Sequence, residues 1–376
     1  MKLHDKRLGG VVTLQRGHDL PESSRKDGPV PVVSSSGITG YHNISKAQPP
    51  GVVTGRYGTL GEVFYIDEPY WPLNTALYAI DFHGNNPRFI AYFLKQVLRR
   101  TRSDKAAVPG VNRNDLHEIQ VRIPDANTQG RIANIVVAYD DLIENNRRRI
   151  KLLEDTARLL YREWFVEFRF PGHEHVKILD RVPEGWERRR FVEVIEVNPI
   201  TSIERNGPIT YVPMAALSAS GMSVDSELLE QRPKATAVHF RNGDTLLARI
   251  TPCLENGKTA FVNFLQNGEA ACGSTEFIVL RGKQVSSFFV YCLARTERLR
   301  GIAIKSMIGS SGRQRVQASC FDEFVVPIPP KHILAVFDDF ASSTFHQIRV
   351  LTGMNDRLIK AGNLILPKLM SGELGV

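Results

Sequence analysis

The stretch YDDLIENNRRRIKLLEDTARLLYREWF, residues 139–165, repeats its mostly apolar seam positions every seven residues and so predicts one long helix. Two interleaved series with this spacing form the seam: Tyr139, Asn146, Leu153 and Leu160, and Ile143, Ile150, Ala157 and Trp164. The same frame returns 205 residues later (Tyr139 to Thr344) in a second set: Thr344, Leu351, Leu358 and Ile365, and Ile348, Asn355, Gly362 and Leu369. A register held over this length is typical of helices packed along each other. We therefore expect an antiparallel coiled-coil rod with these interface residues: Ile143, Ile150, Leu153, Leu160, Ile348, Leu351, Leu358 and Ile365.

The alternative is that each helix only covers its own globular domain, as a single apolar stripe commonly does. The other faces of the first helix argue against this alternative, because they are crowded with charge: Asp140, Asp141, Glu144, Arg147, Arg148, Arg149, Lys151, Glu154 and Asp155. Such charged faces suit a rod better than a helix packed on a domain, so the pattern favours a coiled pair.

The segments before each helix also resemble each other. FIAYFL at 89–94 matches FFVYCL at 288–293, and the segment before each helix ends in Ile-Pro, at 123–124 and 328–329. The offset between copies grows along the chain: 183 from Leu8 to Phe191, 193 from Arg56 to Arg249, 199 from Phe89 to Phe288, and 205 from Pro124 to Pro329. A growing offset indicates loops of different length. The expected fold is therefore α+β, with two tandem pseudo-repeats, each a mixed α/β globular domain followed by a long helix.

This pattern divides the chain into four parts. We expect a first globular domain at 1–127, a central helix at 128–170, a second globular domain at 171–330 and a C-terminal helix at 331–376. A chain of 376 residues exceeds one typical core, and each half has ordinary domain size.

The composition favours a cytoplasmic protein. No stretch has the apolar length of a membrane span, and the start of the chain lacks the apolar core of a secretory signal. All four cysteines lie in the second half without paired spacing, so we expect free thiols and no metal site: Cys253, Cys272, Cys292 and Cys320.

The net charge of +8 and the pI near 9.3 indicate a polyanionic partner, most simply nucleic acid. Basic residues follow the matched hexapeptides in both halves: Lys95, Arg99, Arg100, Arg102 and Lys105, and Arg295, Arg298, Arg300 and Lys305. At equivalent points they could neutralise phosphates, although a solvated helix face is the alternative for either run alone.

Catalytic motifs for nucleic-acid chemistry are absent from the sequence. There is no phosphate-binding loop, no glycine-rich cofactor motif, no His-Glu-x-x-His and no Asn-Pro-Pro-aromatic tetrapeptide of the kind amino-methyltransferases use. Glu255-x-x-Lys258 resembles half of a nuclease site, but it lacks a preceding acidic partner. We therefore expect no catalytic residues, no bound metal and no cofactor in this chain.

The best candidates for contact with double-stranded DNA lie on polar or glycine-rich loops, where the backbone can approach DNA and Arg can bind guanine or phosphate. Arg56 and Tyr57 lie between glycines, and Arg249 keeps the aligned position in the second half. The full set is Ser35, Arg56, Tyr57, Lys105, Arg113, Arg249, Asn256, Lys258, Lys305, Arg313 and Arg315. A plain surface loop is the alternative for each one taken singly.

Three further stretches resemble one family, the specificity (S) subunits of type I restriction-modification systems. LYREWFVEFRFPGHE at 160–174 is similar to the end of that family's central conserved helix, and VPEGWE at 182–187 to the start of its second recognition half. ILPKLMSGEL at 365–374 is similar to the family's C-terminus. The resemblance covers essentially the whole chain.

The resemblance implies that each globular domain is a target recognition domain and that the helices set the gap between two DNA half-sites. It also implies two methyltransferase subunits as partners, which would carry S-adenosylmethionine, and restriction or translocase subunits in systems that cleave DNA. The alternative function is a non-catalytic coiled-coil scaffold for other proteins, with the positive charge incidental.

Overall fold

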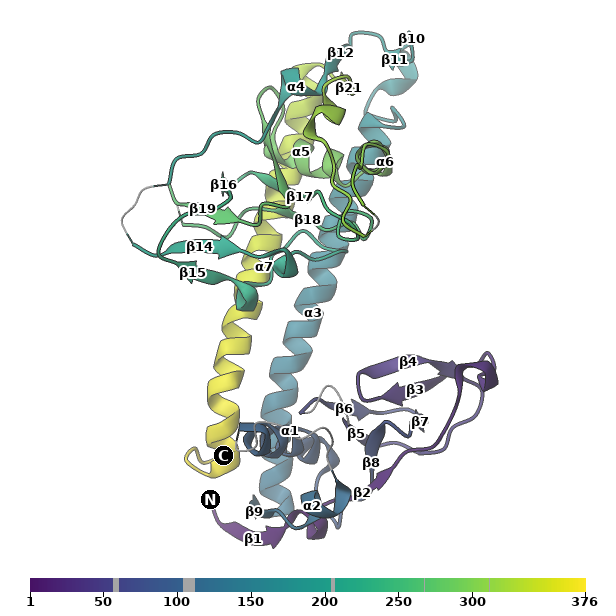
Figure 1. The fold of residues 1–376 in the computed structure, drawn as a ribbon, viewed down its shortest axis with the longest axis vertical. Helices are drawn as coiled ribbons and strands as arrows, with labels where there is room; N and C mark the ends of the chain where they lie inside the picture. The colour runs from purple at the N-terminus through teal and green to yellow at the C-terminus, as the bar shows by residue number, and fades with distance from the viewer. Residues whose placement is uncertain (57–60, 104–111, 204–206, 267, 311) are drawn as a thin grey trace. The chain divides into compact units, whose positions relative to one another are not determined.

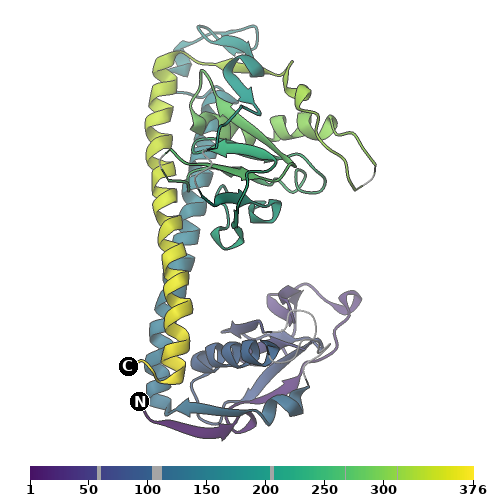
Figure 2. The same cartoon turned by 60° about the vertical axis from the view of Figure 1, so that its left-hand side comes forward.

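The computed structural model describes residues 1–56, 61–103, 112–203, 207–266, 268–310 and 312–376 (Figures 1 and 2). The chain forms two compact units: unit 1 comprises Met1–Ile143 with Leu358–Val376, and unit 2 comprises Glu144–Arg357. The two long helices, α3 (Ala126–Phe165) and α7 (Lys331–Ser371), each contribute to both units. The boundary between the two compact units therefore falls within each long helix, whereas the four-part division of the chain stays a prediction from the sequence.

The described residues of unit 1 form three small sheets. Strands β1 and β9 form an antiparallel pair, strands β2-β8-β5-β6 form an antiparallel four-stranded sheet, and β4-β3-β7 form a third sheet in which β3 and β7 run parallel. Their bounds are β1 Leu3–Arg7, β2 Thr13–Arg16, β3 Val30–Ser34, β4 Gly37–His42, β5 Gly51–Gly55, β6 Val63–Ile66, β7 Trp71–Pro72, β8 Ala76–Asp81 and β9 Gln120–Pro124.

Helix α1 (Pro87–Ser103) provides much of the core of unit 1. Asn86 starts it as an N-cap, since its side-chain oxygen accepts the backbone N–H of Phe89 at 3.0 Å. Phe89 and Ile90 are fully buried, and they share a core with Leu8 and with Ile132 of α3. The short helix α2 (Arg113–His117) packs against β2, where His117 Nε2 accepts the backbone N–H of Leu14 at 3.0 Å.

In unit 2, the part of the chain that the structure describes forms three sheets with related connections and one extra hairpin. Strands β12 and β21 pair antiparallel, β13-β20-β17-β18 form an antiparallel sheet, β15-β14-β19-β16 form a mixed sheet with β14 and β19 parallel, and β10 and β11 form the hairpin. Their bounds are β10 Ile178–Leu179, β11 Val182–Pro183, β12 Glu187–Arg190, β13 Ile195–Val197, β14 Ile209–Val212, β15 Glu230–Arg232, β16 Val238–Arg241, β17 Thr245–Ala248, β18 Thr259–Phe261, β19 Ala270–Gly273, β20 Phe277–Gly282 and β21 Val325–Ile328.

The helices of unit 2 enclose an aromatic core. Besides the long helices, unit 2 contains the shorter helices α4 (Phe191–Val194), α5 (Ser287–Ala294) and α6 (Glu297–Lys305). The Phe165 ring on α3 lies 5.1 Å from the ring of Phe289 on α5 and 5.0 Å from that of Phe337 on α7. The two long helices and the globular part of unit 2 therefore share one core.

The long helices run antiparallel within unit 2. The Asn146 Nδ2 of α3 donates to the Asn355 Oδ1 of α7 at 2.9 Å, and both amides are buried. Further along α3, the Tyr161 ring lies 6.1 Å from the ring of Phe337. In unit 1, the start of α3 and the end of α7 also pack together, because Ile132 shares a core with Leu369. All sixteen seam positions named above are buried or half-buried.

Two expectations from the sequence are wrong in detail. Glu154 does not lie on an exposed charged face, because only 2% of its surface is exposed, beneath the globular part of unit 2. The matched hexapeptides are also displaced by one residue, since the cap of α5 is Ser286, whose hydroxyl accepts the Phe289 N–H at 3.1 Å. By its distance from the N-cap and by its burial, Phe289 is therefore the structural equivalent of Phe89, whereas Phe288 is only half-buried.

Among the described residues, no helix combines the length and the apolar character required to cross a membrane. The four cysteines are free thiols, with Cys272 and Cys292 buried and the other two half-buried.

Candidate nucleic-acid interface

In each unit an arginine directly follows a buried central strand, Arg56 after β5 and Arg249 after β17. The Arg56 N–H donates to the Thr75 carbonyl at 3.0 Å, and the Arg249 N–H donates to the Glu276 carbonyl at 2.9 Å. Both acceptors come immediately before the neighbouring strand, β8 or β20. The same backbone bond thus places the two arginines at the same edge of their respective sheets.

The guanidinium groups of both arginines bind the protein's own backbone. Arg56 Nη1 donates to the Asn74 carbonyl at 3.3 Å, and Arg249 Nη2 donates to the Val316 carbonyl at 2.7 Å. The Arg249 Nε is buried without a hydrogen-bond partner in the described part of the chain. These side chains therefore hold loops in place.

Three loops of unit 2 meet around Arg249. The Val316 N–H donates back to the Arg249 carbonyl at 2.8 Å, and Ile308 and Arg315 exchange two backbone hydrogen bonds of 3.0 Å. The Glu276 carboxylate accepts from Arg315 Nη2 at 2.7 Å and from its Nε at 3.0 Å, and this hydrogen bonding raises the pKa of Arg315. The structure thus brings Arg249, Arg313 and Arg315 onto one assembled surface.

Arg313 lies on this surface, and Lys305 lies at the end of α6, three residues before Ile308. Both side chains are exposed, and no carboxylate in the described residues pairs with either one. Lys305 ends α6, where the helix dipole favours positive charge. A phosphate or a guanine edge could reach both groups without breaking an internal ion pair.

The turn that carries Asn256 and Lys258 has a different character. Asn256 is exposed, but Lys258 is half-buried and its Nζ donates to the Met214 carbonyl at 3.0 Å. Arg295 also binds this turn, through Nη1 to the Gly257 carbonyl at 2.8 Å. Lys258 therefore holds the turn, and Asn256 is the residue that it presents.

In unit 1 the predicted residues lie on separate elements. Ser35 is half-buried in the turn between β3 and β4, where the Ser34 hydroxyl donates to the Gly37 carbonyl at 3.2 Å. Arg113 is exposed at the first position of α2. Tyr57 and Lys105 lie outside the described residues.

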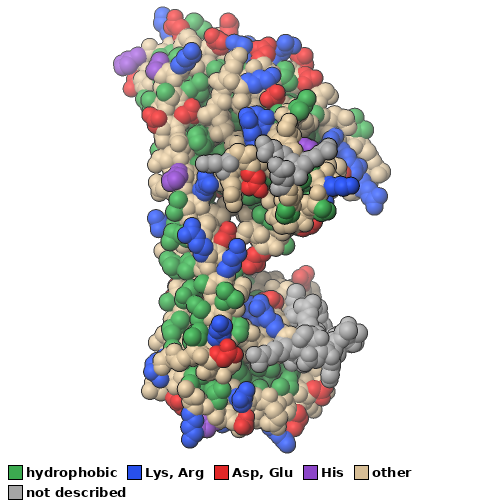
Figure 3. All heavy atoms as spheres, turned by 90° about the vertical axis from the view of Figure 1, so that its left-hand side faces the viewer, with side chains coloured by type: hydrophobic (Ala, Val, Ile, Leu, Met, Phe, Trp, Pro, Cys, Tyr) green, Lys and Arg blue, Asp and Glu red, His purple; other side chains and the backbone are tan. Residues whose placement is uncertain are grey.

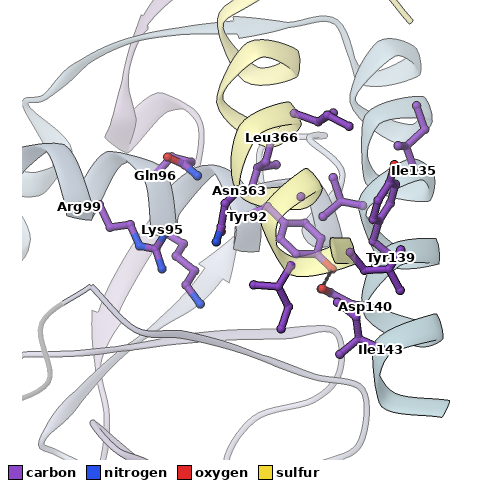
Figure 4. Close-up of a pocket in the computed structure, with 15 residues that line it drawn as sticks. Tyr92, Lys95, Gln96, Arg99, Ile135, Tyr139, Asp140, Ile143, Asn363 and Leu366 are labelled. Carbon is purple, nitrogen blue, oxygen red and sulfur yellow. Dashed lines mark hydrogen bonds between the residues drawn. The ribbon is translucent and has the colours of Figure 1, made fainter. Parts of the chain in front are cut away.

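Part of the basic run on α1 borders a hollow between α1, α3 and α7 in unit 1 (Figure 4). Its volume is about 180 Å³, and Lys95 and Arg99 line it. Lys95 Nζ pairs with Glu62 at 3.4 Å, and the Tyr92 hydroxyl donates to Asp140 at 2.6 Å. Burial, and after it this hydrogen bond, raises the pKa of the Tyr92 hydroxyl. The run therefore has structural partners as well as exposed charge.

The sequence reasoning missed Glu276 and the fixing role of Arg295. The only sign of Glu276 in the sequence was its place directly before a strand that aligns between the two halves. The residue at the equivalent place in the first half, Thr75, is uncharged, so the repeat did not point to a carboxylate. Figure 3 shows basic side chains interspersed with acidic ones over the face in view. On this face, the case for DNA contact therefore rests on the loops and not on a broad basic surface. No group of three His, Cys, Asp or Glu side chains that could hold a metal ion occurs in the described ranges.

Known proteins resemble this chain in sequence and in fold. The family described as "Type I restriction modification DNA specificity domain" matches residues 2–155. The MjaIX specificity subunit of Methanocaldococcus jannaschii is 26% identical over 286 residues, which cover 73% of this chain and 65% of that subunit. The EcoEI specificity subunit of Escherichia coli is 30% identical over 154 residues, 40% of this chain and 26% of that subunit.

A solved structure has the same fold. The type I restriction-modification S subunit from M. genitalium superimposes with a TM-score of 0.63 at 13% identity, covering 98% of this chain and 96% of that chain. The matched segments span about two thirds of the MjaIX subunit and a quarter of the EcoEI subunit. Residues 2–155 therefore match the type I restriction modification DNA specificity domain, and the chain as a whole resembles type I specificity subunits in sequence and in fold.

Proposed function

We propose that this chain reads a bipartite site on double-stranded DNA and positions methyltransferase subunits on it, with no catalytic chemistry or cofactor of its own. Each unit would act as one target recognition domain and read one half-site. The observation that carries the proposal is the repeated edge at Arg56 and Arg249, where the same backbone bond anchors a polar loop in each unit.

The strand pairing supports two diverged copies. Arg7 pairs with Gln120 in β1–β9, and Arg190 pairs with Val325 in β12–β21, which gives the offsets of 183 and 205 expected from the sequence. The antiparallel four-stranded sheets, β2-β8-β5-β6 and β13-β20-β17-β18, have corresponding strand orders. In the mixed sheet of each unit, two described strands run parallel, β3 with β7 and β14 with β19. The α3 and α7 helices also begin 205 residues apart, at Ala126 and Lys331. Two copies of one recognition fold would read two half-sites.

The helices would act as the spacer between the half-sites. Helix α3 has 40 residues, which at ~1.5 Å per residue is roughly 60 Å long. One turn of DNA is ~34 Å, so domains at the two ends of an antiparallel coiled-coil rod would leave unread base pairs between them. The buried Asn146–Asn355 pair supports a single register, because a buried amide finds its partner in one alignment only.

A second apolar face on the helices would receive the methyltransferase subunits. Away from the seam, α3 exposes Leu152 and Leu159, and Val166 directly after its end continues the seven-residue spacing; their surfaces are 66%, 48% and 43% exposed. Helix α7 likewise exposes Val336 and Val350. Exposed apolar series of this kind mark protein-binding surfaces. The methyltransferase would supply S-adenosylmethionine, and restriction or translocase subunits would join the complex in a system that cleaves DNA.

A selection experiment tests this function. The chain co-purified with the methyltransferase encoded beside it would be incubated with random DNA, and the bound fraction sequenced at 0.15 M salt. We expect enrichment of two short motifs at one fixed gap. Arg313→Ala should relax or weaken the motif read by unit 2 only, whereas Arg241→Ala, an exposed arginine away from the assembled loops, should change neither. If DNA is bound without any enriched motif, or not at all, the chain is a protein-interaction scaffold.

A further inference from the structure

An ion pair on the surface around Arg249 holds one arginine in a fixed orientation. Arg315 and Glu276 lie 39 residues apart in the chain, and their side chains are 44% and 22% exposed. The Glu276 carboxylate accepts Arg315 Nη2 at 2.7 Å and Nε at 3.0 Å, so it occupies one side of the planar guanidinium. Exposed ion pairs contribute only about 0–1 kcal/mol to stability, so the main effect of this pair is to fix the direction of the guanidinium.

The backbone on both sides of the pair is also fixed. The Glu276 carbonyl accepts the Arg249 N–H at 2.9 Å, and the Glu276 N–H donates to the Ser274 hydroxyl oxygen at 3.2 Å. Arg315 exchanges two backbone hydrogen bonds of 3.0 Å with Ile308. The guanidinium is therefore in place before a ligand arrives, which lowers the cost of ordering it on binding.

The far end of this guanidinium is left for a ligand. An arginine side chain carries five N–H donors, and in Arg315 the Nε hydrogen and one Nη2 hydrogen serve Glu276. In the described part of the chain, Nη1 contacts the Arg313 carbonyl at 3.5 Å, which is beyond the usual length of a hydrogen bond. Nη1 and the second Nη2 hydrogen can therefore bind two neighbouring acceptors at once.

Two neighbouring acceptors occur on a guanine edge and on a phosphate, and the charge of Glu276 distinguishes between them. A carboxylate within 3.0 Å of the guanidinium neutralises it and repels a phosphate, which is also negative. The guanine edge is uncharged and presents N7 and O6 as acceptors in the major groove. Adenine presents an amino group beside N7, and its hydrogens would meet the donors of Arg315. The pair therefore favours guanine over both adenine and phosphate.

We infer that Arg315, held in position by Glu276, reads a guanine in the half-site of unit 2, an inference that rests on the function proposed above. Arg315 would make the contact with the base, and Glu276 would be a positioning residue. In unit 1 the uncharged Thr75 takes the place of Glu276, since its carbonyl accepts the equivalent backbone bond from Arg56. We therefore expect this guanine contact in one half-site only.

Binding to duplexes that carry single 7-deazaguanines tests the inference, because this base pairs as guanine does but lacks the N7 acceptor. Each guanine of the site selected by the wild-type complex with methyltransferase would be replaced in turn, and affinity measured by fluorescence anisotropy at 0.15 M salt. One replacement should weaken wild-type binding about tenfold, as expected for half of a bidentate contact.

The variants identify the side chain responsible. Arg315→Ala and Arg315→Lys should bind the unmodified duplex more weakly and show no further loss with the same replacement, since lysine keeps the charge but lacks the fork. Glu276→Gln should reduce the tenfold effect to less than about threefold and raise affinity for unrelated DNA, because the carboxylate no longer repels phosphate. Arg241→Ala, an exposed arginine on β16, is the matched control and should keep the tenfold effect.

The outcomes separate this inference from the proposed function. A selected motif with no guanine sensitive to the replacement, or a tenfold effect that persists in both Arg315 variants, would overturn the inference and leave the proposed function intact. A full effect retained in Glu276→Gln would overturn the positioning role of the carboxylate. If the wild-type complex selects no motif at all, the proposed function itself fails.

Discussion

Two tyrosines donate to carboxylates on α3, one of them buried and the other exposed. This difference in burial of the carboxylates predicts different losses of stability when the tyrosine hydroxyl is removed. In unit 2, Glu154 is 2% exposed and accepts the Tyr291 hydroxyl at 2.5 Å and the Met222 N–H at 2.8 Å. In unit 1, the Tyr92 hydroxyl donates to Asp140 at 2.6 Å, but Asp140 is exposed. Water can replace the lost donor at Asp140 and cannot do so readily at Glu154.

Tyr291→Phe should therefore destabilise unit 2 by about 2 kcal/mol, the usual value of a hydrogen bond to a buried charged group. Tyr92→Phe should cost unit 1 about 0.5 kcal/mol, because its acceptor stays solvated. Hydrogen exchange followed by mass spectrometry is the suitable assay, because it reports local opening peptide by peptide. A loss of 2 kcal/mol corresponds to roughly thirtyfold faster exchange in protected peptides of unit 2, against two- to threefold in unit 1 for Tyr92→Phe.

Combining Tyr291→Phe with Glu154→Gln in a double-mutant cycle isolates the hydrogen bond from the loss of packing. A coupling energy below about 0.5 kcal/mol, or equal effects of the two tyrosine substitutions, would refute the argument that burial makes the unit 2 bond the stronger one.

Three further predictions concern the helices and the loops. A seven-residue insertion between Ile150 and Leu153 should lengthen the gap between half-sites in a methylation map without altering either half-site, and altered half-site bases with the gap unchanged would show that the parts are wrongly assigned. Glu276→Gln should free Arg315 from its ion pair and change the motif selected by unit 2, as read by DNA selection, whereas an identical motif would make that pair irrelevant to recognition. Asp125 caps α3, because its carboxylate accepts the N–H and the hydroxyl of Thr128, and these hydrogen bonds lower the pKa of the carboxyl below the usual 3.8. The stabilising effect of Asp125 should therefore be present above pH 3.8 and be lost as the pH falls through the lower pKa of the folded protein. Acid melts of Asp125→Ala that parallel those of the wild type would contradict this.

Periodicity predicted the helices well because one physical constraint sets both spacing and burial. Positions such as Asn146 and Asn355 could be placed in the seam from sequence spacing alone, and the structure buries both. Helix α7 begins at Lys331, directly after Pro329 and Pro330. Because the packing of the helices repeats every seven residues, all seam positions share one register, and a wrong register would have misplaced every one of them.

The errors occurred where tertiary contact overrides local pattern. FFVYCL aligned by letters with FIAYFL, but the N-cap at Ser286 moves the match by one residue, and similar apolar letters could not reveal the shift. Glu154 looked like a surface charge because its neighbours are charged, and only its contacts with Tyr291 and Met222 show why it is buried. The Lys258 ammonium binds the Met214 carbonyl, which lies 44 residues earlier in the chain and could not be foreseen, and its contact with DNA stays a prediction. Loop geometry of this kind depends on long-range contacts, which residue patterns do not encode.

The most direct test of the central claim is long-read methylation mapping of cells that express this chain with its neighbouring methyltransferase, compared with cells that express the methyltransferase alone. We predict methylated adenine in a split motif, with one adenine on each strand and a fixed gap of unread bases. The absence of new methylation, despite a complex that co-purifies, would contradict DNA recognition by this chain and leave only its role as a scaffold.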